Sequence, residues 1–149
     1  MGTVIHIYTA PTRGAAMVAQ TVVIAIEEQG LVGARYERPK NRRGVDYQLT
    51  LIELENIEAY INEVDGAFTP DMPRRNIVTR GTALNDLCGK TFRVGGATCE
   101  GIELCEPCSL FASRMRREVL KFFLHRGGLR ARIVEGGEIR IGDDVEIVK

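Results

Sequence analysis

The 149-residue sequence predicts a mainly β domain, a closed β-barrel with about two helices packed on it. Two observations favour this fold class. Short runs of β-branched and apolar residues recur along the chain, and glycine-rich turn signals separate them. Only two helices are expected, because residues 17–29, which also have apolar residues at helical spacing, favour a strand over 21–26 by their β-branched composition. Closure into a barrel is expected because it leaves few strand edges exposed to solvent.

Two helices are predicted. Residues 53–62 place three apolar side chains on one face, and Thr50 or the turn beside it is expected to cap this helix. The longest helix is predicted over 109–125, where Gly127-Gly128 should end it. One further helical turn is expected over 84–87.

The strands are predicted from β-branched composition and from the turns between them. Gly95-Gly96 is a hairpin signal between two of these strands. The predicted strands cover residues 4–8, 21–26, 47–52, 77–79, 91–94, 97–104, 129–134, 138–141 and 145–148.

Composition limits the classes of function. The chain is 44% hydrophobic and 27% charged, and its formal net charge is zero. This balance argues against a general binder of nucleic acid or of anionic membranes. No apolar run approaches the ~18 residues of a membrane helix, and no export signal is visible. We therefore expect a single domain over 1–149, a cytoplasmic location and reduced thiols.

The sharpest chemical signal is the motif Cys105-Glu106-Pro107-Cys108. It lies between a predicted strand and a predicted helix. Free backbone N–H groups and the helix dipole stabilise a thiolate at such a position. Cys108 is nearest the predicted helix start, so we expect it to be the working sulfur, with Cys105 second. A thiolate there can carry sulfur or bind a soft metal.

Other interpretations of the four cysteines stay open. Cys105 and Cys108 can form a thiol–disulfide pair, because strand, C-x-P-C and helix is the thioredoxin arrangement, although the flanking β-α-β alternation is absent. A structural zinc site would need a second close pair. Free cysteines are also often inert core residues, which is our expectation for Cys88 and Cys99.

Cationic side chains accompany the motif. Arginine forks recognise phosphate and carboxylate, so these residues would form an anion pocket beside the thiol if their segments converge. The alternative is that they are solvated surface side chains. His125 either orients a ligand or completes the helix, since the helix dipole favours a cation there. The candidate anion-binding residues are Arg35, Arg75, Asn76, Arg80 and Arg130.

Several motifs in order resemble the MOSC domain family, named after the C-terminal part of molybdenum cofactor sulfurase. The resemblance spans roughly residues 17–148 and implies a barrel like that of pyruvate kinase. Ala34 stands where the family pattern has Asp. The similar segments are Gly30-Leu-Val-Gly-Ala-Arg-Tyr36, Leu49-Thr-Leu-Ile52, Arg75-Asn-Ile-Val-Thr-Arg-Gly81, Phe92-Arg-Val-Gly95, Cys105-Glu-Pro-Cys108, Gly127-Gly-Leu-Arg-Ala-Arg132 and Gly142-Asp-Asp-Val145.

The resemblance implies a connection to molybdenum cofactor (molybdopterin). Cys108 matches the family cysteine that carries persulfide sulfur in sulfurase members and ligates molybdenum in reductase members. A sulfur donor such as a cysteine desulfurase is implied as partner, because the pyridoxal-phosphate desulfurase module has no counterpart here and no pyridoxal phosphate site is found. Three roles remain open: a sulfur transferase, a component of a molybdenum-dependent reductase, and a non-catalytic cofactor-binding module.

Overall fold

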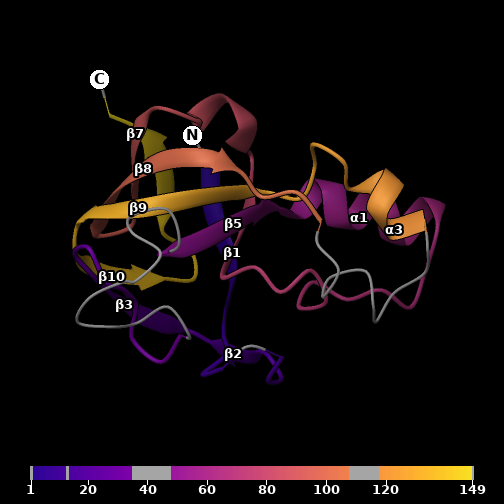
Figure 1. Cartoon of the computed structure of the whole chain (residues 1–149), viewed down its shortest axis with the longest axis horizontal. Coiled ribbons are helices and arrows are strands. Elements are labelled where there is room, and N and C mark those ends of the chain that lie inside the picture. The colour runs from indigo at the N-terminus through magenta and orange to yellow at the C-terminus, as the bar shows by residue number, and fades with distance from the viewer. Residues whose placement is uncertain (1, 13, 35–47, 108–117, 149) are drawn as a thin grey trace.

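Seven strands form a closed ring in the computed structural model, which describes residues 2–12, 14–34, 48–107 and 118–148 (Figure 1). The order around the ring is β11-β7-β8-β9-β5-β6-β1, and β11 pairs again with β1. The strand β2 (Val18–Gln20) pairs with β1 outside the ring. The ring strands are β1 (Gly2–Thr9), β5 (Leu49–Glu53), β6 (Ile77–Arg80), β7 (Thr91–Val94), β8 (Ala97–Leu104), β9 (Leu129–Glu135) and β11 (Asp144–Ile147).

The seam between β1 and β11 closes the ring. Gly2 is registered with Val145 and Thr3 with Asp144. Beyond these pairs, the Val4 N–H donates to the Asp143 carbonyl at 2.8 Å. The seam therefore joins segments that are about as far apart in the sequence as any two in the described chain.

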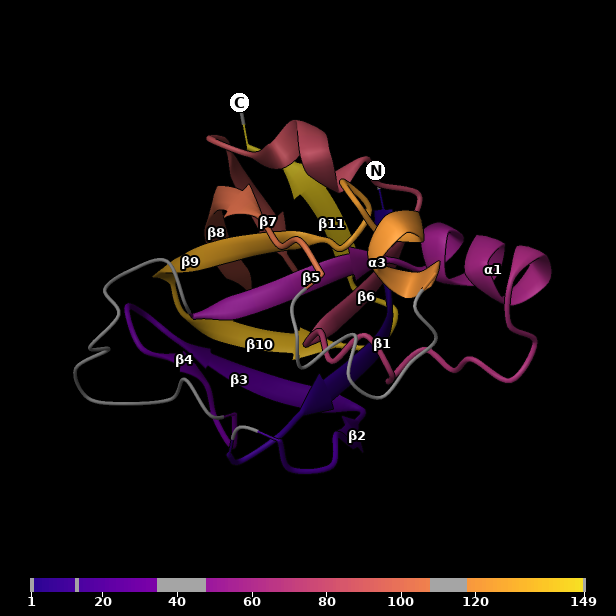
Figure 2. The same ribbon diagram turned by 45° about the vertical axis from the view of Figure 1, so that its right-hand side comes forward.

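A smaller sheet packs beside the barrel. It has the order β10-β3-β4, with β10 (Gly137–Arg140), β3 (Val22–Ile26) and β4 (Gly30–Leu31) (Figure 2). A hydrogen bond of 2.8 Å from Gly96 N to Glu138 O joins this sheet to the β7–β8 turn.

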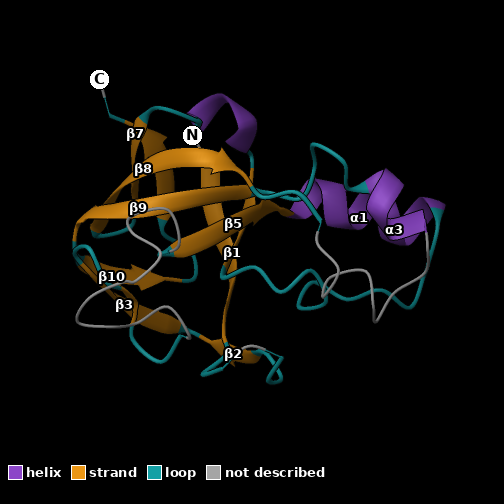
Figure 3. Cartoon of the chain, in the orientation of Figure 1, coloured by secondary structure: helices purple, strands orange, loops and turns teal. Residues whose placement is uncertain are grey.

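Two helices lie side by side at one end of the barrel (Figures 1 and 3). α1 (Leu54–Glu63) connects β5 to β6, which are parallel and so need a crossover between them. α3 (Glu118–Phe122) packs against α1 through an aromatic cluster. Within it, the rings of Tyr60 and Phe68 lie 4.6 Å apart and those of Tyr60 and Phe123 lie 5.3 Å apart. A 3-10 helix, η2 (Leu84–Leu87), packs against β8 near Gly101.

The barrel interior is filled by apolar side chains from every ring strand. Strand residues alternate between interior and exterior, as in β8, where buried and partly buried positions alternate through its first half. Burial of this set supplies the main favourable term in folding. Representative members are Val4, Leu49, Leu51, Ile77, Phe92, Val94, Cys99, Leu129, Ile133 and Val145.

The predicted fold class is confirmed, and so are the bounds predicted for β7, β8 and η2. The expected cap of α1 is wrong. The N-cap residue is Glu53, which makes no side-chain capping hydrogen bond, because Thr50 lies inside β5 and is bonded to Asn76.

Two further element predictions need correction. The strand predicted over 21–26 begins at Val22, and the sequence did not reveal β2 before it. The helix predicted over 109–125 ends at Phe122, because residues 123–126 form turns in which His125 has a φ of 61°. Its part before 118 lies outside the described residues. Among the helices that the structure does describe, none is long and apolar enough to span a membrane.

Candidate functional site

The thiol segment, residues 105–107, follows β8 directly. Cys105 is only 3% exposed. Its N–H donates to the Gly128 carbonyl at 2.7 Å, which fixes the segment against the turn that precedes β9. Gly127 allows this close approach, because a Cβ there would lie 2.3 Å from the Cys105 carbonyl oxygen. Cys108 itself lies outside the described residues.

Arg75 contacts the thiol segment from the interior of the protein. Its side chain is buried, and its Nε donates to the Gly127 carbonyl at 2.8 Å. Its Nη2 lies 3.1 Å from the Cys105 carbonyl oxygen and 3.4 Å from that of Glu106. One planar guanidinium thus holds two chain segments together and places a fixed positive charge beside the motif.

His125 holds the other side of the thiol segment. Its backbone N–H donates to Glu106 Oε1 at 2.8 Å, and its ring Nδ1 lies 2.9 Å from Glu106 Oε2. The His125 carbonyl accepts from Asn85 Nδ2 at 2.9 Å. Nothing local in the sequence signals this pair, because the two residues are 19 positions apart.

Asn76 ties three strands together beside Arg75. Its Nδ2 donates to the Tyr8 carbonyl at 3.1 Å, and its Oδ1 accepts from the Thr50 backbone at 3.0 Å. Burial raises the pKa of Tyr8, and the Asp71 carboxylate adds to that effect. The buried Asn76 amide therefore sets the position from which Arg75 reaches the thiol segment.

The other predicted arginines are spread over the barrel. Arg130 pairs with Glu103 at 2.8 Å, on the strands that lead into and out of the thiol segment. Arg80 lies at the far end of β6 from Arg75 and pairs with Glu58 at 2.8 Å. Its hydrogen bond to Glu58 raises the pKa of Arg80. Arg35 lies outside the described residues. The structure thus brings Arg75, Asn76 and Arg130 towards the thiol segment and places Arg80 apart.

The two remaining cysteines differ from each other. Cys99 faces the barrel core, and burial raises the pKa of its thiol to about 12, which confirms its packing role. The same prediction for Cys88 is wrong. Cys88 is exposed, because it follows η2 at the surface, where its Sγ lies 3.5 Å from the Ile102 carbonyl oxygen. Within the described ranges, no group of three or more His, Cys, Asp or Glu residues is placed to hold a metal ion.

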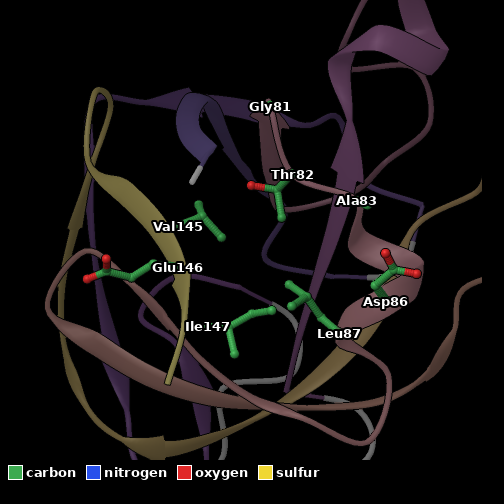
Figure 4. Close-up of a pocket in the computed structure, with 8 residues that line it drawn as sticks. All are labelled: Gly81, Thr82, Ala83, Asp86, Leu87, Val145, Glu146 and Ile147. Atoms are coloured by element: carbon green, nitrogen blue, oxygen red, sulfur yellow. The ribbon is translucent and has the colours of Figure 1, made fainter. Parts of the chain in front are cut away.

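A surface pocket of about 350 Å³ lies elsewhere, between β11 and the segment from the end of β6 to η2 (Figure 4). Leu87, Val145 and Ile147 line it with apolar side chains, and Asp86 and Glu146 lie at its edge. None of its lining residues belongs to the thiol segment or to the groups that hold it. The pocket is therefore separate from the thiol segment.

These features define a small barrel protein with a thiol-bearing loop at one rim. They are the barrel itself, its parallel β5–α1–β6 crossover and the motif at the end of β8. The chain belongs to the MOSC domain family, whose model matches residues 38–146. This family is associated with molybdenum cofactor binding and with sulfur chemistry. No curated protein matches the sequence.

Solved structures share the fold at low sequence identity. The YUAD protein from Bacillus subtilis superposes with a TM-score of 0.80 at 14% identity, over 99% of this chain and 96% of that one. YiiM from Geobacillus stearothermophilus gives 0.78 at 16% identity, over 100% of this chain and 76% of that one. YiiM from Escherichia coli gives 0.72 at 19% identity, over 100% and 70%. At these identities the similarity establishes the fold.

Proposed function

We propose that this protein carries sulfur, or binds a metal–sulfur species, at Cys108 in molybdenum-cofactor chemistry. The observation that supports this most directly is the buried Arg75 guanidinium, which is hydrogen-bonded to the carbonyls of Cys105 and Glu106. Arg75 thereby fixes the chain that leads into Cys108, the cysteine whose thiolate both sulfur transfer and soft-metal binding need.

The sulfur-carrier form of the proposal is a displacement without net oxidation. The Cys108 thiolate attacks the terminal sulfur of a donor persulfide, R–S–SH. A new S–S bond forms on Cys108, the donor S–S bond breaks, and R–S⁻ leaves with the electron pair. The proton of the donor stays on the terminal sulfur, so the product is Cys108–S–SH. A cysteine desulfurase in the cytoplasm is the proposed source of the donor persulfide.

Molybdenum cofactor is proposed on the kind of donor that the motif offers and on the charge of the arginines around it. Cys108 would be the soft ligand, and molybdenum held there would supply redox and sulfur-accepting chemistry. For the anionic end of the cofactor, Arg35 and Arg130 are the proposed contacts. Arg75 and Asn76 are proposed to act by holding the segment in place, and Arg80 is the weakest of the candidates because it pairs with Glu58 at the other end of β6.

The proposal is tested with Cys108→Ser, and with Cys88→Ser as a matched control, because Cys88 is an exposed thiol away from the motif. Mass spectrometry measures persulfide on the protein after incubation with a small persulfide donor. Metal and pterin analysis of protein purified from its own host measures cofactor retention. Cys108→Ser should abolish one or both signals, whereas Cys88→Ser should preserve them.

The pattern of loss separates the roles. Loss of persulfide formation indicates a sulfur carrier, and loss of retained cofactor without any transfer in the wild type indicates a binding module. If Cys108→Ser leaves both signals at wild-type level, the thiol-centred proposal is wrong.

A further inference from the structure

The carboxylate of Glu106 is held by two groups of a single residue. Both of its oxygens are engaged, Oε1 by the His125 backbone N–H at 2.8 Å and Oε2 by the ring Nδ1 at 2.9 Å. An ordinary surface ion pair joins two mobile side chains and contributes little. Here one of the two donors is backbone, so the carboxylate is fixed relative to the chain itself.

The backbone of His125 is unusual in a way that serves this contact. Its φ of 61° lies in the left-handed region, which costs a non-glycine residue about 1–2 kcal/mol. Asparagine and glycine tolerate this conformation best. Backbone strain of this kind persists where surrounding contacts impose it, and the Asn85 bond to the His125 carbonyl is one such contact.

The thiol segment is therefore held by hydrogen bonds from two sides. Arg75 holds the backbone carbonyls of Cys105 and Glu106 from the buried side. His125 holds the Glu106 side chain from the exposed side. Because Glu106 lies inside the Cys105–Cys108 motif, both contacts act on the chain that carries the thiols.

We propose that Glu106 and His125 form a latch that positions the thiol segment for attack on its sulfur donor. The inference rests on the proposed function, in which Cys108 is the attacking sulfur. His125 is a positioning residue in this scheme: it orients the segment through Glu106 and takes no part in bond breaking. Attack on a persulfide and attack on iodoacetamide are both in-line displacements. A bulky persulfide donor can approach the thiolate from few directions, whereas a small alkylating agent can approach it from many.

The test compares His125→Gly with His125→Asn in the full chain. Both replacements tolerate the left-handed backbone, but only Asn keeps a side-chain donor that can reach a carboxylate. Glu28→Gly is the matched control. Glu28 also has a left-handed φ, of 62°, and its carboxylate forms an exposed pair with Arg132 at 3.0 Å.

Three quantities are measured for each variant. They are the rate of persulfide formation on Cys108 from the protein-bound persulfide of a cysteine desulfurase, the rate of Cys108 alkylation by iodoacetamide, and hydrogen exchange in the peptide that contains residues 105–107. His125→Gly should slow persulfide formation about tenfold while alkylation changes less than about twofold. It should also increase hydrogen exchange in that peptide. His125→Asn should restore the rate of persulfide formation and the protection from hydrogen exchange. Glu28→Gly should change neither of these two quantities.

Because His125→Gly keeps the backbone N–H that bonds Glu106 Oε1, this variant tests the ring contact. Persulfide formation in His125→Gly at the wild-type rate, or hydrogen exchange with wild-type protection, would overturn the positioning role proposed for His125. If the wild type forms no persulfide at all, the proposed function fails, and hydrogen exchange still decides whether the latch exists. An equal fall in the persulfide and alkylation rates would also count against positioning, since it would indicate general unfolding.

Discussion

Thr50 and Asn76 are joined by three hydrogen bonds at the start of the parallel strands β5 and β6. The backbone N–H and the Oγ1 hydroxyl of Thr50 both donate to Asn76 Oδ1, at 3.0 and 3.2 Å. In return, the Asn76 backbone N–H donates to Thr50 Oγ1 at 3.0 Å. Because Arg75 directly precedes Asn76, these bonds also fix the position of the Arg75 backbone at the rim of the barrel.

Asn76→Ala should therefore destabilise the protein by about 1–3 kcal/mol, because it leaves the Tyr8 carbonyl and the Thr50 N–H without their partner. Urea unfolding measures this change. Thr50→Val also removes the bond from Thr50 Oγ1 to Asn76 Oδ1, so the double variant should cost less than the sum of the single variants. Strict additivity would show that the two side chains are not coupled.

Arg75→Ala should lower the free energy of unfolding by about 2–4 kcal/mol, since three carbonyl oxygens lose a buried charged donor. Arg75→Lys should recover only part of the loss, because an ammonium lacks the planar fork. Arg80→Ala is the control and should be nearly neutral, because its ion pair with Glu58 is exposed. Equal effects of Arg75→Ala and Arg80→Ala would contradict the structural role of Arg75.

Gly128→Ala should be more damaging than Gly142→Ala. Both glycines have a left-handed φ, of 110° and 95°, so backbone strain is common to the two substitutions. A Cβ at Gly128 would lie 1.9 Å from the Leu51 carbonyl oxygen, whereas a Cβ at Gly142 meets nothing within 4 Å. Thermal and urea unfolding should show an additional cost at Gly128 of about 1–3 kcal/mol. A smaller effect at Gly128 than at Gly142 would rule out this packing.

The buried Cys99 thiol should make the free energy of unfolding decrease at alkaline pH. Burial raises the pKa of its thiol from 9.0 to about 12. Between these values the unfolded chain releases the thiol proton and the folded chain keeps it, so stability decreases by up to about 1.4 kcal/mol per pH unit. Cys99→Ala should remove this part of the slope, which urea unfolding at pH 8 to 11 can measure against the wild type. Identical slopes would mean that the thiol ionises in the folded state.

Local patterns predicted the elements whose determinants are local. The bounds of β7 and β8 follow from the Gly95-Gly96 turn and the β-branched runs beside it. α1 follows from its apolar spacing, and its observed range is within one residue of the predicted one. By contrast, β2 exists because Gln20 pairs with Ile7 of β1, which no pattern within residues 18–20 indicates.

The candidate site was predictable only in part, for the same reason. Arginines near the motif were expected to bind an external anion, yet the contacts observed for Arg75 are main-chain carbonyls 30 and 52 residues away. Thr50 was expected to cap a helix, yet its partner is 26 residues away. Residue type predicted the chemistry that each side chain can perform, but only the barrel topology determines its partner.

The β1–β11 seam gives the barrel a particular order of assembly during translation. Gly2 and Thr3 precede the other ring strands in the sequence, but their partners Val145 and Asp144 emerge only after those strands have been synthesised. Until then, one edge of β1 has no neighbour in the ring. Contacts of such long sequence separation have the largest loop-closure cost and form late. The nascent chain therefore passes through an open sheet with an exposed strand edge, in which pairing with other chains competes with completion of the ring.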